Sequence, residues 1–187
     1  MNTLQIKNVT ANEGGSVTFE ASDFNLGQDL SQDVDDNYND VITIYVDEDA
    51  TGANDGSSWT NAFVSLKDAT DYATLAGDEI WIADGTYTPD ASGRTSSFRI
   101  FAGVSVYGGF NGTETSIENR NVTINTTILS GDLNADDNAI ITDTEPTRQD
   151  NSYHVITLKG NFGTAKPVID GFTITGGNAN GGADIAC

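Results

Sequence analysis

Short apolar runs that each end in a glycine turn recur along the chain, and they constrain the fold more than any other feature. The first, Gly77–Tyr87, reads G-D-E-I-W-I-A-D-G-T-Y, with four apolar residues between an acidic pair and the Asp84-Gly85 turn. Val104–Phe110, Thr127–Asp132 and Ile169–Gly177 repeat the scheme. Runs of this length, rich in β-branched and aromatic residues and bounded by turn residues, predict β-strands.

The spacing of these strands favours a solenoid over a sandwich. Successive strands begin roughly twenty to thirty residues apart, and in a solenoid each coil buries its apolar positions against the next. A sandwich would instead be built from hairpins at intervals of about 8–12 residues. The long segments Gly112–Asn125 and Leu133–Ser152 are then expected to be loops between strands.

The composition agrees with an all-β, turn-rich protein and limits its partners. The 187 residues include 20 Gly and 28 acidic against 8 basic residues, a formal net charge of −20. Such a surface repels nucleic acid and anionic membranes, so we expect neither as a partner. No apolar run approaches the ~20 residues of a membrane span. Cys187 is the single cysteine, so no intrachain disulfide is expected.

The region before residue 41 is expected to be separate from the strand ladder. Residues 1–28 contain two alternating runs joined by Asn12–Gly15, which predict a β segment able to exchange a strand with a neighbouring molecule. Residues 29–40 are rich in Asp and Asn and predict an acidic linker. The alternation of Asp33, Asp35 and Asn37 leaves calcium binding there as an alternative.

One segment carries helical periodicity. Phe63, Leu66, Ala69 and Tyr72 recur at helical spacing, and Asn61 is a suitable N-cap, so we expect a helix at 62–75. Its apolar stripe would cover the first layer of strands. The sequence therefore predicts three segments: 1–28, 29–40, and a strand ladder with its capping helix at 41–187.

The segment after Ser130 contains the best arrangement of metal ligands. Asp132, Asn134, Asp136 and Asn138 occupy alternating positions and Asp143 stands at the twelfth, as in an EF-hand loop. The sixth position is Asp137 rather than Gly, so a hydrated acidic loop remains the alternative. We expect calcium in a structural role. A looser second set comprises Asp47, Asp49, Asn54 and Asp55.

The residues give little support to catalysis. A uronate lyase needs an Arg or Lys base beside calcium-binding carboxylates, but the basic residues are scattered. A glycosidase needs two carboxylates across a cleft, which 28 acidic residues would provide by chance. His154 is the lone histidine and is expected to be structural. The following aromatic residues could line a sugar-binding face or stack between strands: Trp59, Trp81, Tyr87, Phe98, Tyr107 and Phe110.

Several motifs in order resemble the opening of secreted bacterial proteins with a right-handed parallel β-helix of the pectin-lyase-like type. These motifs are Tyr45–Asp47, Thr51–Trp59, Gly77–Tyr87, Val106–Thr115, Thr127–Asp132, Asn151–Val155 and Ile169–Ala179. The resemblance covers about residues 42–182. It implies a right-handed parallel β-helix, here of about four to five coils, and an N-terminal portion of a large secreted or cell-surface protein, often adhesin-like.

We therefore expect a non-catalytic, extracellular structural or adhesive module. Uncovered strands at the end of a ladder promote association, so we expect a homo-oligomer or fibre formed by end-to-end stacking or strand exchange. Surface glycans are possible partners. A carbohydrate-binding module and a fragment of a polysaccharide lyase or hydrolase remain the alternatives.

Overall fold

The structure is a computed structural model that describes residues 41–90, 93–142, 144–163 and 165–181. The segments expected at 1–28 and 29–40, together with Asp143 and Cys187, lie outside the described residues. Within the described part the chain is mostly short strands, with one α-helix, α1 (Leu66–Tyr72). The strands are β1 (Thr43–Val46), β2 (Glu79–Ala83), β3 (Gly85–Tyr87), β4 (Phe98–Phe101), β5 (Ser105–Phe110), β6 (Thr127–Ser130), β7 (Ile156–Lys159), β8 (Val168–Asp170) and β9 (Phe172–Thr175).

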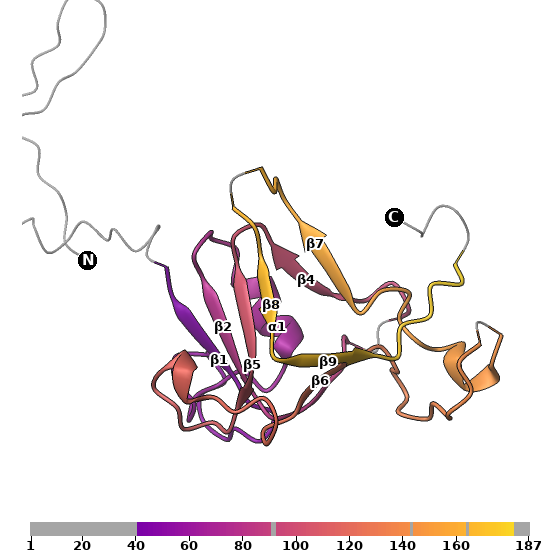
Figure 1. The fold of residues 1–187 in the computed structure, drawn as a ribbon, viewed down its shortest axis with the longest axis horizontal. Coiled ribbons are helices and arrows are strands. Elements are labelled where there is room, and N and C mark those ends of the chain that lie inside the picture. Colours follow the sequence, from indigo (N-terminus) through magenta and orange to yellow (C-terminus); the bar gives the residue numbers. More distant parts are fainter. Residues whose placement is uncertain (1–40, 91–92, 143, 164, 182–187) are drawn as a thin grey trace, which may run out of the picture. The chain divides into compact units, whose positions relative to one another are not determined.

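The paired strands all run parallel and fall into three separate sheets, which the chain visits in a fixed order. The sheets have the orders β1-β2-β5-β8, β3-β6-β9 and β4-β7. Thus β2, β3 and β4 enter the first, second and third sheet, β5, β6 and β7 do the same, and β8 and β9 begin another round. Figure 1 shows β1, β2, β5 and β8 side by side. The expectation of a mainly β chain with parallel strands is confirmed at this level.

A single hydrophobic core is shared by the three sheets and the helix. Ile80 and Ile82 of β2 belong to it, as do Phe98 of β4 and Leu129 of β6, and each is almost fully buried. Side chains alternate between the two faces of the first sheet, and the register partners Ile44, Ile80 and Val106 all face the core. Because side chains from all three sheets meet there, the sheets are held together mainly by apolar burial.

Glycines allow the backbone segments at the ends of the strands to approach one another closely. Gly171 separates β8 from β9 with φ +88°, a conformation that side-chain-bearing residues rarely adopt. A Cβ added there would lie 2.6 Å from the carbonyl oxygen of Gly108. Gly131 and Gly176 are equally close, because a Cβ added at Gly131 would lie 2.7 Å from the carbonyl oxygen of Gly176. The glycine turns of the sequence are therefore places where backbone packs on backbone.

The N-terminal end of the strand stack is covered by the chain itself. Helix α1 packs against β1, β2 and β4, and buries Leu66 and Ala69. It is shorter than the expected 62–75, because Ser65 rather than Asn61 caps it by accepting a hydrogen bond from the Asp68 amide at 3.3 Å. The outer edge of β1 is also occupied: the Tyr45 amide donates to Gly56, and the Phe63 amide donates to Tyr45.

The opposite end of the stack is uncovered among the described residues. The strands β7, β8 and β9 each have one partner strand within that part of the chain. Leu158 is 47% exposed, Val168 is 41% exposed and Ile174 is 52% exposed. Their register partners in the preceding layer are far less exposed; Ile100 opposite Leu158 is 2% exposed and Leu129 opposite Ile174 is 1% exposed. The two ends of the stack thus differ in how far apolar side chains meet solvent.

Candidate metal site

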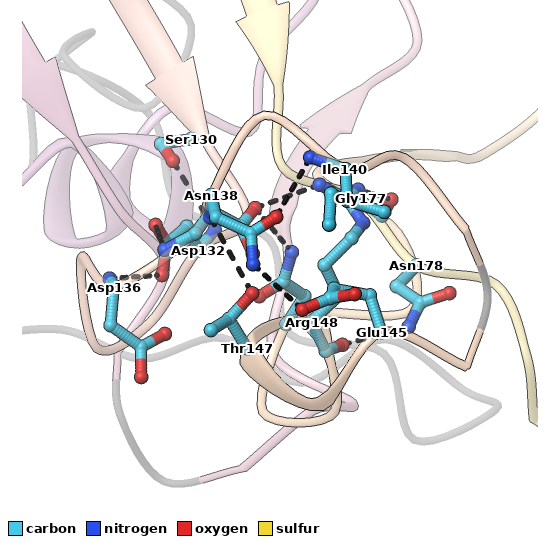
Figure 2. A network of polar contacts seen from close by, with 12 residues as sticks. Ser130, Asp132, Asp136, Asn138, Ile140, Glu145, Thr147, Arg148, Gly177 and Asn178 are labelled. Carbon is cyan, nitrogen blue, oxygen red and sulfur yellow. Dashed lines mark hydrogen bonds and ion pairs between the residues drawn. The ribbon is translucent and has the colours of Figure 1, made fainter.

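The acidic loop between β6 and β7 is shaped by the carboxylate of Asp132, which follows β6. Its Oδ1 accepts a hydrogen bond from the Asp136 amide at 3.2 Å, and its Oδ2 accepts one from the Asp137 amide at 3.0 Å. Ser130 Oγ accepts from the Asp132 amide at 3.2 Å. Figure 2 shows these contacts at the start of the loop. Asp132 therefore closes a tight turn around itself, as Asp commonly does in loops.

Three carboxylates meet beside this turn. Asp132, Asp136 and Asp150 each offer an oxygen, and the three oxygens lie within 4.8 Å of one another. Asp150 comes from the far end of the loop, after the short 3₁₀ helix η5 (Pro146–Arg148). The pKa of Asp136 is raised, most strongly by partial desolvation and next by the nearby negative charges of Asp150 and Asp132. The arrangement concentrates negative charge that a cation would relieve.

A largely buried ion pair fixes the loop to the segment after β9. Arg148 Nη1 donates to Asp137 Oδ2 at 2.8 Å, and the two side chains are 10% and 15% exposed. Arg148 Nη2 donates to the Gly177 carbonyl oxygen at 2.9 Å, while Asn178 Nδ2 donates to the Arg148 carbonyl oxygen at 2.7 Å. Figure 2 shows Arg148 reaching Gly177 from within the loop. The loop and the last layer are therefore one connected polar network.

The predicted ligand set is brought together in part. Asp132 and Asp136 are close, whereas Asn134 is exposed and Asp143 lies outside the described residues. Asn138 Oδ1 instead accepts from the Ile140 amide at 2.7 Å, and its Nδ2 donates to Glu145 at 2.7 Å. The sequence pattern did not reveal the third carboxylate, Asp150, because its distance along the chain from Asp132 matches no known spacing of metal ligands. The loop folds back and brings Asp150 close to Asp132.

The looser second set, in the loop after β1, consists of side chains that stabilise turns. Asp47 accepts from the Asp49 amide at 3.0 Å, and Asn54 accepts from the Val64 amide at 2.8 Å. Asp55 accepts from the Ser57 amide at 3.0 Å, and hydrogen bonds from Ser57 lower its pKa. Each of these three side chains therefore has a backbone partner of its own, which accounts for its place in the turn.

The aromatic residues contact one another on the outer face of the first sheet. Trp81 and Phe110 are stacked with ring centroids 4.9 Å apart, and both are buried. Trp59 lies 4.8 Å from Tyr45 and 5.5 Å from Phe110, and its Nε1 donates to the Glu114 carbonyl oxygen. Tyr87 and Phe98 are buried in the core. The available ring faces are thus largely used in packing among these residues.

All four arginines of the sequence hold backbone or carboxylate groups in place. Arg94 donates to the Asn151 carbonyl oxygen at 2.7 Å, Arg99 to Asp71 at 2.7 Å, and Arg120 to the Gly108 carbonyl oxygen at 3.0 Å. Arg148 binds Asp137 as described above.

An open hollow of about 280 Å³ beside α1 is lined by Lys67, Asp90, Thr95, Ser96, Ser97 and Arg99. Its two cations are both paired with Asp71.

His154 lies two residues before β7 and is half-buried. In the part of the chain that the structure describes, no helix is long and apolar enough to cross a membrane. No family model matches the chain, and no curated protein or solved structure among those compared matches it either. The proposals below therefore depend on the residues and their geometry.

Proposed function

We propose that the strand-bearing part of the chain is a short right-handed parallel β-helix. The observation that supports this best is the order in which the strands enter the three sheets, because a chain that coils repeatedly generates that order. The shared core of the three sheets is a second support. The right hand is proposed because connections between parallel strands of one sheet are right-handed in almost all proteins. By this count β1 is the start of a first coil and β8–β9 the start of the last.

The module is proposed to be non-catalytic and to serve a structural or adhesive role in a secreted or cell-surface protein. The structural engagement of every arginine supports this, since a uronate lyase needs a basic group free to take a proton. The strong negative charge supports solubility. The alternatives, glycan binding and polysaccharide cleavage, are less well supported because most of the aromatic rings pack against one another and the four arginines are engaged by carboxylates or backbone oxygens.

The partner proposed for the uncovered end is a second copy of the chain. Unpaired strand edges with apolar side chains favour addition of another strand. Because β1 is covered, and β7, β8 and β9 have no second strand partner within the described residues, the simplest association joins these three strands of two copies. Growth into a fibre would require a further donor strand, and the alternating runs within residues 3–20 stay the predicted donor.

Sedimentation velocity between about 1 and 200 µM tests this proposal. The chain is expected to associate with rising concentration, and Ile174→Lys, on β9, is expected to weaken the association at least tenfold. Ile124→Lys is the matched control, because Ile124 is 75% exposed on the loop before β6. A monomer at every concentration, or equal weakening by both variants, would contradict the association. Binding or turnover of polysaccharides from a broad panel would contradict the purely structural role.

A further inference from the structure

We propose that Asp132, Asp136 and Asp150 bind one calcium ion that braces the acidic loop against the last layer of strands. The ion-binding step does not depend on the proposed self-association and can be measured without it. Carboxylates from two distant parts of one loop supply the ligands. The loop already contacts the segment after β9 through Arg148, so the site has a structural target.

The spacing of the three carboxylates fits one calcium ion. Calcium takes oxygen ligands at about 2.3–2.6 Å, so two ligands on opposite sides of one ion lie up to about 5 Å apart. The separations here do not exceed 4.8 Å, which one calcium ion can span. Magnesium requires a near-ideal octahedron at about 2.1 Å and gives up its bound water reluctantly, so a site made of protein side chains favours calcium.

A second observation is a group of buried oxygens without hydrogen-bond partners in the same loop, one of which belongs to Asp150 of the cluster. Asp150 Oδ2, Asn151 Oδ1 and Ser152 Oγ are buried and have no hydrogen-bond partner among the described residues, and Asp137 Oδ1 is in the same condition. The side chains of Asn151 and Ser152 are fully buried. A buried oxygen without a partner is destabilising, so such a group calls for a ligand.

Other atoms of Asn151 and Asp137 join these two residues to the carboxylate cluster by hydrogen bonds. Asn151 Nδ2 donates to Asp137 Oδ2 at 2.9 Å, and the Asp137 amide donates to Asp132 Oδ2 at 3.0 Å. Asp150 is itself one of the three clustered residues. Carboxylate, amide and hydroxyl oxygens are hard donors of the type that calcium takes, and six to eight of them complete its shell together with water.

Calcium bound here would stabilise the last layer through contacts already present. An ion that holds Asp132 and Asp150 fixes both ends of the loop, which places Asp137 against Arg148. Arg148 in turn donates to Gly177, just beyond β9. Calcium is therefore expected to raise the unfolding temperature, whereas a chelator lowers it to the value of the ion-free protein.

Isothermal titration of the chelator-treated full chain with calcium chloride tests the site, with thermal unfolding followed in parallel at low protein concentration. We expect saturable binding of one ion, with a dissociation constant of about 10⁻⁴–10⁻³ M, the range of extracellular modules. Asp136→Asn should weaken binding at least tenfold. Asp136 is exposed, so this variant should fold. Magnesium chloride should bind more weakly than calcium chloride.

Asp68→Asn is the matched control, because it removes the same charge from an exposed position on α1 and should leave calcium binding unchanged. Absence of saturable binding to the unaltered chain would overturn the site. Equal effects of Asp68→Asn and Asp136→Asn would do the same, since they would assign binding to the overall negative charge. Binding that is normal while the chain remains monomeric would support the site and count against self-association alone.

Discussion

Truncation of Ile100 is the most informative test of a core shared by the three sheets. Ile100, on β4, is 2% exposed and belongs to the core that includes residues of α1 and the other two sheets. Ile100→Ala removes three carbon atoms, worth about 2.4 kcal/mol of transfer free energy at ~0.8 kcal/mol each. The cavity left behind adds to this, so the free energy of unfolding should fall by about 3 kcal/mol.

The register partner of Ile100 provides the control. Leu158, on β7, stands opposite Ile100 but is 47% exposed. Leu158→Ala removes the same number of carbon atoms, yet about half of this residue already meets solvent, so less burial is lost and no closed cavity is expected. Its cost should be about 1 kcal/mol or less.

Urea denaturation followed by circular dichroism measures both variants against the unaltered chain. Ile100→Ala should also lower the melting temperature by roughly 6–12 °C, since 1 kcal/mol corresponds to about 2–4 °C in a chain of this size. Equal losses from the two variants would refute the reasoning, because they would mean that β4 and β7 are buried to the same degree. A larger loss from Leu158→Ala would refute it more strongly.

Substitutions at Gly171 and Asp71 test the close backbone contact at the turn between β8 and β9 and the ion pairs of Asp71. Gly171→Ala should destabilise the fold by about 1–3 kcal/mol in urea denaturation, because residue 171 has φ +88° and an added Cβ would meet the Gly108 carbonyl oxygen; Gly163→Ala, in the loop between β7 and β8, should cost much less. Burial would raise the pKa of Asp71, but hydrogen bonds from Lys67 and Arg99 outweigh it and hold the pKa below 3.8. A lowered pKa stabilises the fold above the unfolded value, so Asp71→Asn should reduce stability at pH 7, and the difference from the unaltered chain should vanish as the pH falls below 3.8. A difference that stays constant with pH would contradict this cause.

The sequence predicts the strands with the longest apolar runs, for a physical reason. Ile80–Ala83 and Val104–Phe110 are rich in β-branched and aromatic residues, so local propensity and burial agree, and both runs fall in strands. By contrast β4 follows a loop and has the short sequence F-R-I-F, and β3 has three residues. Their strand conformation depends on pairing with β7 and β6, which no local pattern reveals.

The division of Ile169–Gly177 also exceeds what a pattern can predict. The run was expected to be one strand, but Gly171 turns the chain so that β8 and β9 join different sheets. The acidic loop shows the same limit. Asp132 and Asp136 are near each other in sequence and were expected to be close, whereas Asp150 joins them because Asp137 and Arg148 hold the loop closed.

The parallel stacking of strands that the proposed coils require is tested most directly by cysteine cross-linking. Ser105 of β5 and Val168 of β8 are register partners, and neighbouring strands lie about 4.8 Å apart, within the Cα separation that a disulfide needs. In a chain with Cys187→Ser, the pair Ser105→Cys and Val168→Cys is therefore expected to form a disulfide, detected by mass spectrometry of the monomer. In the control pair, Ser105→Cys and Asp170→Cys, the two positions are offset by two residues. Their Cα atoms are then more than about 7 Å apart, so this pair should not cross-link efficiently. Efficient cross-linking of the displaced pair, without cross-linking of the register pair, would contradict the coiled parallel stack.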